Sequence, residues 1–217
     1  MKRSEREALA APPSLVLASA SPRRAQLLQM LDLHFDIEPA RIDERYTPGE
    51  GPAAHAERLA REKALAIASS RRDAIVIGSD TVVVIDGDVL GKPVHADDAV
   101  RMLLLLQGRE HTVATGVAVA HGGAVRSGIE RVRVRFRPFG ADRAIAYVQT
   151  GEPMDKAGAY GIQGYGSALV ERIEGDYFAV MGLPIVRLLG LLESLGFDYD
   201  FRGLSRGGDA ATGIRPG

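Results

Sequence analysis

The segment that most constrains the fold is residues 15–28, which read LVLASASPRRAQLL. Its first four residues are apolar, as in a short buried strand. Ser21 stands where a helix N-cap is expected, and Pro22 fits the first helical position. Apolar residues then recur through the following helix. A strand that leads directly into a helix is typical of α/β proteins, so this segment predicts an α/β fold.

Arg23 and Arg24 fall in the first turn of that helix, which is an unusual place for cations. The unpaired N–H groups and the helix dipole already make this end positive, so it favours anions. The two arginines make sense if a strongly anionic group, such as a phosphate chain, binds there. The alternative is that both side chains extend into solvent. We favour the anion site because α/β proteins bind ligands at strand-to-helix junctions.

The composition narrows the class of protein. The chain has 217 residues, of which 46% are hydrophobic and 25% charged, as in an ordinary globular protein. A formal net charge of −1 argues against nucleic-acid binding over a broad surface, although it allows a local basic pocket. The chain has no cysteine, which excludes disulfides, thiolate metal sites and a cysteine nucleophile.

The sequence also predicts a location and a domain organisation. No apolar run is long enough to span a membrane and no signal peptide is evident, so we expect a cytoplasmic protein without membrane contact. We expect one domain over residues 14–200. Residues 1–13 and 201–217 lack apolar periodicity, and we expect flexible tails there.

Apolar periodicity and turn signals predict the remaining elements. Further helices are expected over residues 52–70, 97–106, 138–150 and 183–195. Further strands are expected over residues 34–37, 74–85, 89–90, 112–120, 124–136 and 168–173. Turn signals at residues 86–87 and 121–123 predict hairpins, which interrupt the alternation of strands and helices. We therefore expect a mixed rather than a purely parallel sheet.

Charged residues interrupt two apolar patterns. Lys63 lies on the apolar stripe of its helix, four residues after Leu59 and four before Ile67. Its ammonium group either reaches solvent or points into a polar cleft. Asp80 interrupts a buried strand, where a carboxylate is costly unless it is paired or binds a metal. An ion pair or a β-bulge at Gly78 would explain it structurally, but we favour a functional Asp80 because the glycine allows close backbone approach.

Two further segments carry candidate residues. Lys92 lies in the turn LGKP, where a solvent-exposed lysine is the plain alternative. Residues 152–164, EPMDKAGAYGIQG, are rich in glycine and could wrap a ligand, with Gln163 reading the edge of a base. In the alternative the segment is an irregular surface loop, with Asp155 and Lys156 paired to each other.

Other polar residues are poorer candidates. The arginines at positions 131, 133, 135 and 137 alternate with apolar residues and indicate a strand with one basic, solvent-facing side. The five histidines show no ligand spacing, although His111 opens a strand. No phosphate-binding P-loop or serine-histidine-aspartate motif is present.

Several stretches resemble, in the same order, the Maf family of nucleoside-triphosphate pyrophosphatases. They extend from about residue 15 to about residue 195 and read LASASPRR, IDE, RLAREKA, IGSDTVV, LGKP, GREHTVATGV, EPMDKAGAYGIQG and DYFAVMGLPI. The resemblance implies an elongated mixed β-sheet with flanking helices and two lobes around a deep cleft. It also implies a homodimer that hydrolyses a nucleoside triphosphate between the α and β phosphates to a monophosphate and pyrophosphate.

The resemblance implies catalytic roles for several residues. Asp80 matches the residue usually assigned as proton acceptor, and Glu44 matches an acidic residue linked to metal binding or catalysis. Lys63 and Lys92 match cations that contact the triphosphate. We expect Glu44 and Asp80 to be metal ligands as well, and oxygen ligands favour Mg²⁺ or Mn²⁺. The sequence leaves open whether Asp80 is the base, a metal ligand or both.

The resemblance also implies substrate contacts at Ser19, Arg23 and Arg24. Subfamilies differ at the positions of Arg23, Thr81 and Gln163, and this combination resembles the branch that acts on dTTP and UTP, with modified pyrimidine nucleotides as further candidates. One alternative is the branch that acts on 7-methyl-GTP, which a panel of triphosphates would distinguish. Another is a regulator of cell division that binds a nucleotide without turnover. Binding without pyrophosphate release would indicate the latter.

Overall fold

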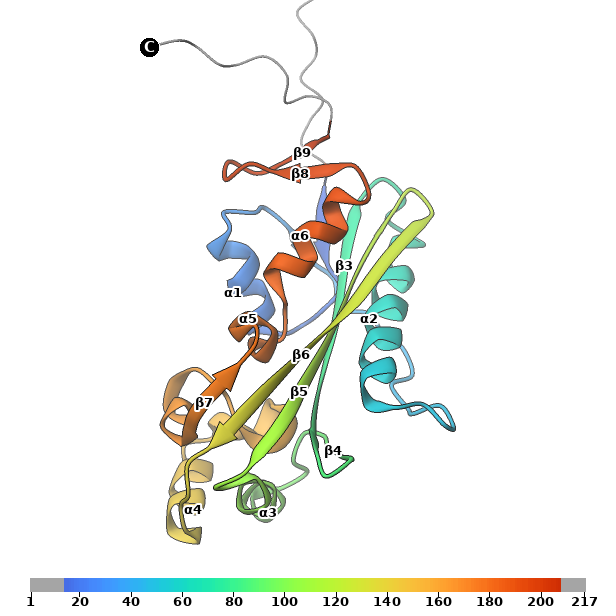
Figure 1. The fold of residues 1–217 in the computed structure, drawn as a ribbon. Coiled ribbons are helices and arrows are strands. Elements are labelled where there is room, and N and C mark those ends of the chain that lie inside the picture. Colours follow the sequence, from blue (N-terminus) through green and yellow to red (C-terminus); the bar gives the residue numbers. More distant parts are fainter. Residues whose placement is uncertain (1–13, 208–217) are drawn as a thin grey trace, which may run out of the picture.

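The computed structural model describes residues 14–207 and shows an elongated α/β molecule (Figure 1). A seven-stranded sheet has the order β2-β1-β3-β5-β6-β7, and β4 pairs with β3. Its strands are β1 Leu15–Leu17, β2 Asp36–Ile37, β3 Ile75–Ile85, β4 Asp88–Leu90, β5 Glu110–His121, β6 Ala124–Phe136 and β7 Val170–Glu174. β1 is parallel to β2 and β3, and the other pairs are antiparallel. The expectation of a mixed sheet is confirmed.

Tight turns connect the long strands. Asp86 and Gly87 join β3 to β4 with φ angles of 54° and 91°, and Gly122 and Gly123 join β5 to β6 with φ angles of 56° and 82°. Positive φ at both central positions is the requirement of the type I′ hairpin turn. The turn signals in the sequence therefore placed both hairpins correctly.

The helices are α1 Pro22–Met30, α2 Pro52–Ala68, α3 Ala96–Leu106, α4 Ala141–Gln149, α5 Tyr177–Met181 and α6 Ile185–Glu193. The two strands β8 Phe197–Tyr199 and β9 Leu204–Arg206 form a separate hairpin beside α6. α1, α6 and this hairpin gather at one end of the molecule, and α3 and α4 gather at the other (Figure 1). No helix within residues 14–207 combines the length and apolar character needed to cross a membrane.

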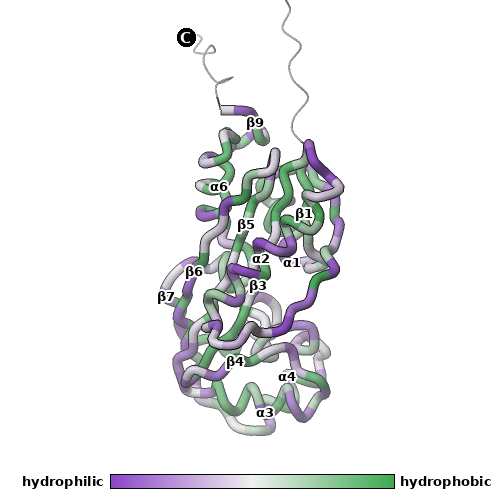
Figure 2. Tube along the Cα trace, turned by 90° about the vertical axis from the view of Figure 1, so that its right-hand side faces the viewer, coloured by the Kyte–Doolittle hydropathy of each residue, from purple (hydrophilic) through white to green (hydrophobic). Residues whose placement is uncertain are grey.

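Each end of the molecule has its own hydrophobic core. Leu17, Leu28, Val117 and Leu188 belong to the core under α1 and α6. Other residues form the core under α3 and α4, including Val83, Leu103, Leu106, Val134, Phe136 and Tyr147. The long strands contribute to both cores and carry apolar segments through the two halves (Figure 2). The sheet therefore joins two lobes, as the resemblance implied.

α2 packs along the opposite face of the sheet from α6. Side chains alternate between faces along β5, so Val117 faces α6 while Ala118 packs with Ala60 of α2. Gly78 and Gly116 make this contact unusually close. A Cβ atom at Gly78 would lie 2.1 Å from the Ala60 carbonyl oxygen, and one at Gly116 would lie 2.3 Å from the carbonyl oxygen of Ala56. The close approach that we expected at Gly78 is therefore to a helix.

The predicted elements are present, with several differences. The short helix α5 and the strand β8 were not predicted. Short 3₁₀ helices at Glu152–Asp155, Ala157–Ala159 and Gly164–Leu169 occupy and extend beyond the glycine-rich segment of residues 152–164. The C-terminal tail was placed too early, because β9 follows residue 200 and the Gly207 N–H donates to the Gly196 carbonyl oxygen at 2.7 Å. The flexible segments expected over residues 1–13 and beyond residue 207 lie outside the described residues.

Candidate active site

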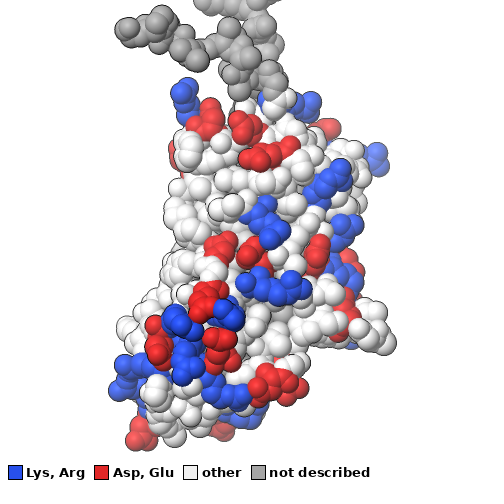
Figure 3. Space-filling view, in the orientation of Figure 1, with Lys and Arg blue, Asp and Glu red and all other residues white. Residues whose placement is uncertain are grey.

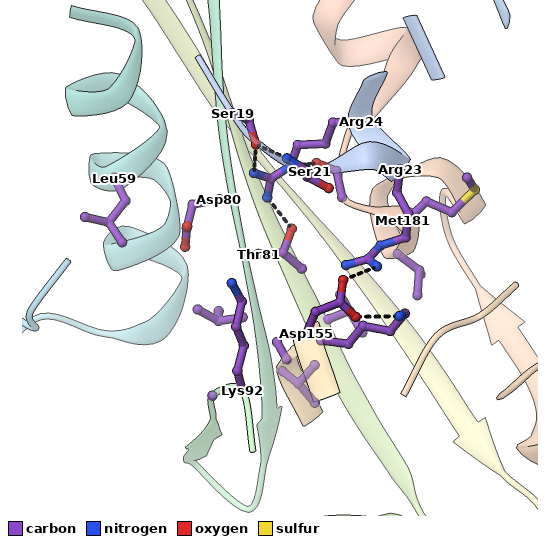
Figure 4. Close-up of a pocket in the computed structure, with 18 of the residues that line it drawn as sticks. Ser19, Ser21, Arg23, Arg24, Leu59, Asp80, Thr81, Lys92, Asp155 and Met181 are labelled. Atoms are coloured by element: carbon purple, nitrogen blue, oxygen red, sulfur yellow. Dashed lines mark hydrogen bonds and ion pairs between the residues drawn. The ribbon is translucent and has the colours of Figure 1, made fainter. Parts of the chain in front are cut away.

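A pocket of about 670 Å³ lies between the two lobes. This volume falls in the range of small-molecule sites. Every residue to which the sequence assigned a site role lines it, namely Ser19, Arg23, Arg24, Glu44, Lys63, Asp80, Thr81, Lys92 and Gln163. Figure 4 shows that they come from the turn between β1 and α1, from α1, from β3 and from the turn after β4, among other segments. The fold thus gathers residues that are up to 144 positions apart in the chain into one cleft.

Lys63 lies between two carboxylates. Its Nζ is 2.7 Å from Asp80 Oδ1 and 2.8 Å from Glu44 Oε1. Lys63 is 8% exposed although it lies on the apolar stripe of α2, so its ammonium group points into the polar cleft rather than to solvent. The ion pair that we considered as the structural explanation of Asp80 is therefore present. It does not exclude function, because the pair lies in the wall of the pocket.

The charges around Glu44 keep it ionised. Partial burial acts to raise its pKa, but the hydrogen bond and charge of Lys63, with the charges of Lys92 and Arg24, lower the pKa below its ordinary value. Glu44 comes from the loop between β2 and α2 and its side chain is 58% exposed. An exposed carboxylate that stays charged is suited to bind a cation together with a substrate phosphate.

Arg24 is fixed by several acceptors of the protein. Its Nε donates to the Gly182 carbonyl oxygen at 2.8 Å and its Nη1 donates to Ser19 Oγ at 3.0 Å. Its Nη2 lies 3.3 Å from Thr81 Oγ1, and Thr81 in turn contacts Thr115. Burial is the main cause that lowers the pKa of Arg24, which reflects how deeply the guanidinium lies. Arg24 therefore connects Thr81, a predicted specificity position, to the start of α1.

The Arg23 side chain, unlike that of Arg24, extends across the pocket. Its Nη1 lies 3.1 Å from Asp155 Oδ2, and Asp155 Oδ1 lies 2.6 Å from Lys156 Nζ (Figure 4). The pairing of Asp155 with Lys156 was one of the alternatives from the sequence, whereas the contact with Arg23 was not predicted. α1 belongs to one lobe and Asp155 to the other, so this ion pair bridges the mouth of the cleft.

Lys92 and Gln163 complete the lining. Neither side chain makes a hydrogen bond or ion pair with another residue within positions 14–207, so both are available to a ligand. Lys92 extends toward Asp80 and Thr81 (Figure 4). Gln163 is exposed and immediately precedes the 3₁₀ helix Gly164–Leu169.

The start of helix α1 after Ser21 was also predicted correctly, but the Ser21 side chain makes no capping hydrogen bond.

The donor set is compatible with a divalent cation. Glu44 and Asp80 contact the same ammonium nitrogen, so their carboxylates lie within two hydrogen-bond lengths of each other. No cluster of three or more acidic, histidine or cysteine side chains suited to a metal occurs in the described part of the chain. Mg²⁺ commonly uses one or two carboxylates and completes its shell with water and substrate phosphates, so two carboxylates fit such an ion.

Two arginines of the basic strand β6 pair with glutamates. Arg133 pairs with Glu174, and Arg135 Nε lies 3.4 Å from Glu171 Oε2. Figure 3 shows blue and red side chains intermixed over β6 and β7. Cross-strand glutamates thus neutralise much of this face, in agreement with our interpretation of it as a solvent-facing strand.

Comparison with known proteins agrees with the motifs. The family model described as Maf-like protein matches residues 14–195. This chain belongs to the Maf family. It is 54% identical over 186 residues to the dTTP/UTP pyrophosphatase of Moorella thermoacetica, covering 85% of this chain and 96% of the relative. It is 45% identical over 181 residues to the dTTP/UTP pyrophosphatase of Aquifex aeolicus, covering 83% and 95%.

Some features of this Maf site had no clear sequence signal. Asp155 contacts Arg23 across 132 positions, which no local pattern indicates. Gly182 places its carbonyl oxygen between Arg24 and Ser79 Oγ, which donates to it at 2.8 Å. Its φ angle of 107° ends α5. A glycine after the apolar run FAVM is a helix-end signal, and it could have revealed both α5 and this carbonyl group.

Proposed function

We propose that this Maf protein hydrolyses dTTP and UTP, and related modified pyrimidine nucleotides, between the α and β phosphates. The products are the nucleoside monophosphate and pyrophosphate. The observation that carries the proposal is the convergence of every predicted site residue on one pocket between the lobes. The names of the curated relatives support dTTP and UTP over 7-methyl-GTP. No observation favours a regulator without turnover.

The pocket offers cations for a triphosphate. Lys63, Lys92, Arg23 and Arg24 all line it. Positive groups that are fixed before the substrate binds stabilise the charge of the transition state without further reorganisation. Arg24 is held by three contacts, so its position is set in advance, whereas Lys92 is free to move onto a phosphate. We assign Ser19 to the same substrate-binding group because it orients Arg24.

Asp80 is the proposed proton acceptor for the attacking water. Asp80 lines the pocket, its Oδ1 accepts from Lys63, and its Oδ2 makes no hydrogen bond with the described residues. One oxygen is thus anchored and the other is available to take a proton. A carboxylate at this position is a suitable general base, provided that water lies within hydrogen-bond reach.

Glu44 is the proposed ligand of Mg²⁺ or Mn²⁺, with Asp80 as a second ligand. When bound, such an ion would neutralise phosphate charge and make a bound water more acidic. Lys63 orients both carboxylates through its two contacts. Arg23, Thr81 and Gln163 are the proposed specificity residues. The homodimer, the cytoplasmic location and the absence of nucleic-acid binding stay predictions.

The test is pyrophosphate release from a panel of dTTP, UTP, CTP, GTP and 7-methyl-GTP with Mg²⁺ or Mn²⁺. The proposal expects dTTP and UTP to be the best substrates, with the monophosphate and pyrophosphate in equal amounts. A preference for 7-methyl-GTP would contradict the assignment of Arg23, Thr81 and Gln163 as pyrimidine-selecting residues. Release of inorganic phosphate instead of pyrophosphate would contradict the proposed position of cleavage.

A further inference from the structure

Glu44 comes from a segment with little structure of its own. Residues 38–47 between β2 and α2 form neither helix nor strand. The Glu44 side chain is 58% exposed and its one ion pair is with Lys63. A loop of this kind samples many conformations unless other contacts restrict it. Something else must hold the backbone so that Glu44 meets Lys63 and Asp80.

Glu50, at the end of this segment, is the centre of such contacts. Its Oε1 accepts from Arg58 Nε at 2.7 Å, and its Oε2 accepts from Arg58 Nη2 at 2.9 Å. Its Oε2 also accepts from the Thr47 N–H at 3.2 Å and lies 3.0 Å from His55 Nδ1. The Glu50 side chain is only 10% exposed. Arg58 and His55 belong to α2, so Glu50 ties the loop to this helix.

The same helix also fastens the two residues that directly follow Glu44. Arg58 Nη2 donates to the carbonyl oxygen of Arg45 at 3.0 Å. The ring of Tyr46 stacks on His55, with centroids 3.5 Å apart and planes 4° from parallel. We call Glu50, Arg58, His55 and Tyr46 the loop clasp. Lys63 lies on the same helix, so the clasp and the partner of Glu44 share one rigid element.

We propose that Glu50 and Arg58 are positioning residues that hold Glu44 in place beside Lys63 and Asp80, and thereby set the affinity of the site for its divalent cation. The proposal rests on the proposed function, in which Glu44 is a metal ligand. Groups that orient a metal ligand commonly change metal affinity or activity by about 10–100-fold when they are replaced.

The first variant is Glu50→Gln, which keeps the shape but removes the charge that Arg58 binds. The amide can accept from only one of the two Arg58 nitrogens. We expect the half-saturating Mn²⁺ concentration for dTTP hydrolysis to rise by about 10–100-fold. Arg58→Lys should act in the same direction, because one ammonium group cannot reach Glu50 and the Arg45 carbonyl with the geometry of a guanidinium.

Glu62→Gln is the matched control. Glu62 also accepts from Arg58, through Nη1 at 3.0 and 3.1 Å, but it lies on α2 itself and does not touch the loop. This variant should leave the Mn²⁺ dependence unchanged. Circular dichroism of each variant reports whether the fold is retained.

Mn²⁺ binding gives a readout independent of turnover. The free Mn²⁺ signal in electron paramagnetic resonance, recorded with enzyme and the α,β-methylene analogue of dTTP and compared with the analogue alone, measures the affinity of the enzyme site. The proposal expects weaker binding in Glu50→Gln and Arg58→Lys but not in Glu62→Gln. If both clasp variants bind Mn²⁺ as the wild type does, the proposal is wrong.

A double-variant cycle tests whether Glu50 acts through Glu44. Glu44→Ala removes the ligand, so adding Glu50→Gln to it should cause little further loss of activity. Fully additive losses would overturn the inference. If Glu44→Ala alone is fully active, the proposed role of Glu44 fails first and the inference fails with it. If Glu44→Ala is impaired while Glu50→Gln is normal, only the inference fails.

Discussion

At the scale of single residues, the pocket is organised by contacts that exist before a ligand binds. Arg24 and Lys63 each satisfy more than one acceptor, so neither side chain is free to rearrange. Groups held in this way lose little conformational entropy when a substrate arrives. Lys92 and Gln163 differ from them because they have no such partners among the described residues.

The Arg24 contacts give a prediction. Arg24→Lys keeps the positive charge but cannot supply the forked donors that reach Gly182, Ser19 and Thr81. Loss of one or two charge-assisted hydrogen bonds corresponds to about 10–100-fold in kcat/KM for dTTP. Steady-state kinetics measure this value. An unchanged kcat/KM would show that only the charge of Arg24 matters.

His111 predicts a dependence of stability on pH. The ring is buried between Phe136 and Tyr160, and burial lowers its pKa from 6.5 to about 4. The unfolded chain therefore binds a proton near pH 6.5, while the folded chain does so only near pH 4. The free energy of unfolding should fall by about 3 kcal/mol as pH drops through this window, and His111 contributes no such change above it.

Urea unfolding of wild type and His111→Phe at several pH values from 4 to 7 tests this prediction. The variant loses the contact of His111 Nε2 with the Tyr160 hydroxyl at 2.7 Å, and the loss of this contact lowers its stability by an amount that does not change with pH. Only the change of the free energy of unfolding with pH shows whether His111 is responsible. Parallel curves for the two proteins would mean that His111 does not cause the loss.

At the scale of elements, α2 connects the pocket to the loop clasp. It carries Lys63 on the pocket side and Arg58 and His55 at the loop clasp. Its distance from the sheet depends on Gly78 and Gly116, where a side chain would collide with the helix backbone. The position of Lys63 is therefore set by glycines in the neighbouring strands.

Gly78→Ala should disturb this packing. The added methyl group would lie 2.1 Å from the Ala60 carbonyl oxygen, so α2 must shift away from β3. We expect a loss of about 1–3 kcal/mol in the free energy of unfolding, with reduced dTTP hydrolysis because Lys63 moves with the helix. Gly190→Ala in α6 is the control, since no atom lies within 4 Å of its added methyl group. Equal stability of the two variants would contradict the packing account.

Most elements could be predicted from sequence because their signals are local. The strands from Ile75 to Ile85 and from Glu110 to Phe136 have apolar runs bounded by turn residues, which fixed their positions within a few residues. The short helix Tyr177–Met181 and the strand Leu204–Arg206 could not be found in the same way. Elements of three to five residues are stabilised by tertiary contacts, and their local signal is weak.

At the scale of the whole molecule, the two lobes meet at the pocket and the Arg23–Asp155 pair spans it. A substrate phosphate that binds Arg23 must replace this carboxylate. Because the pair is partly exposed, it contributes about 0.2–1 kcal/mol. Asp155→Asn should therefore lower KM for dTTP by up to about fivefold. A higher KM would indicate instead that Asp155 holds Arg23 in its binding position.

The location of the site could be predicted from sequence, but its internal contacts could not. Every residue selected from the sequence lines the pocket. Arg23, Lys63 and Asp80 interrupt local patterns, whereas Ser19 and Glu44 were selected only from the resemblance to the Maf family. The partners of these residues are distant in the chain. Lys63 meets Glu44 from a loop, and Arg24 meets the carbonyl group of Gly182. Such pairings depend on how the lobes assemble, and local sequence patterns do not predict contacts between distant residues.

The most direct test of the central claim is pyrophosphate release from dTTP by wild type and Asp80→Asn, with saturating Mg²⁺. The amide keeps the size of the side chain and still accepts a hydrogen bond from Lys63, so the fold should be retained. Loss of a general base predicts turnover reduced by about 10²–10⁴-fold, with nucleotide binding preserved. Full activity in Asp80→Asn would contradict the claim that this pocket carries out hydrolysis with Asp80 as the proton acceptor.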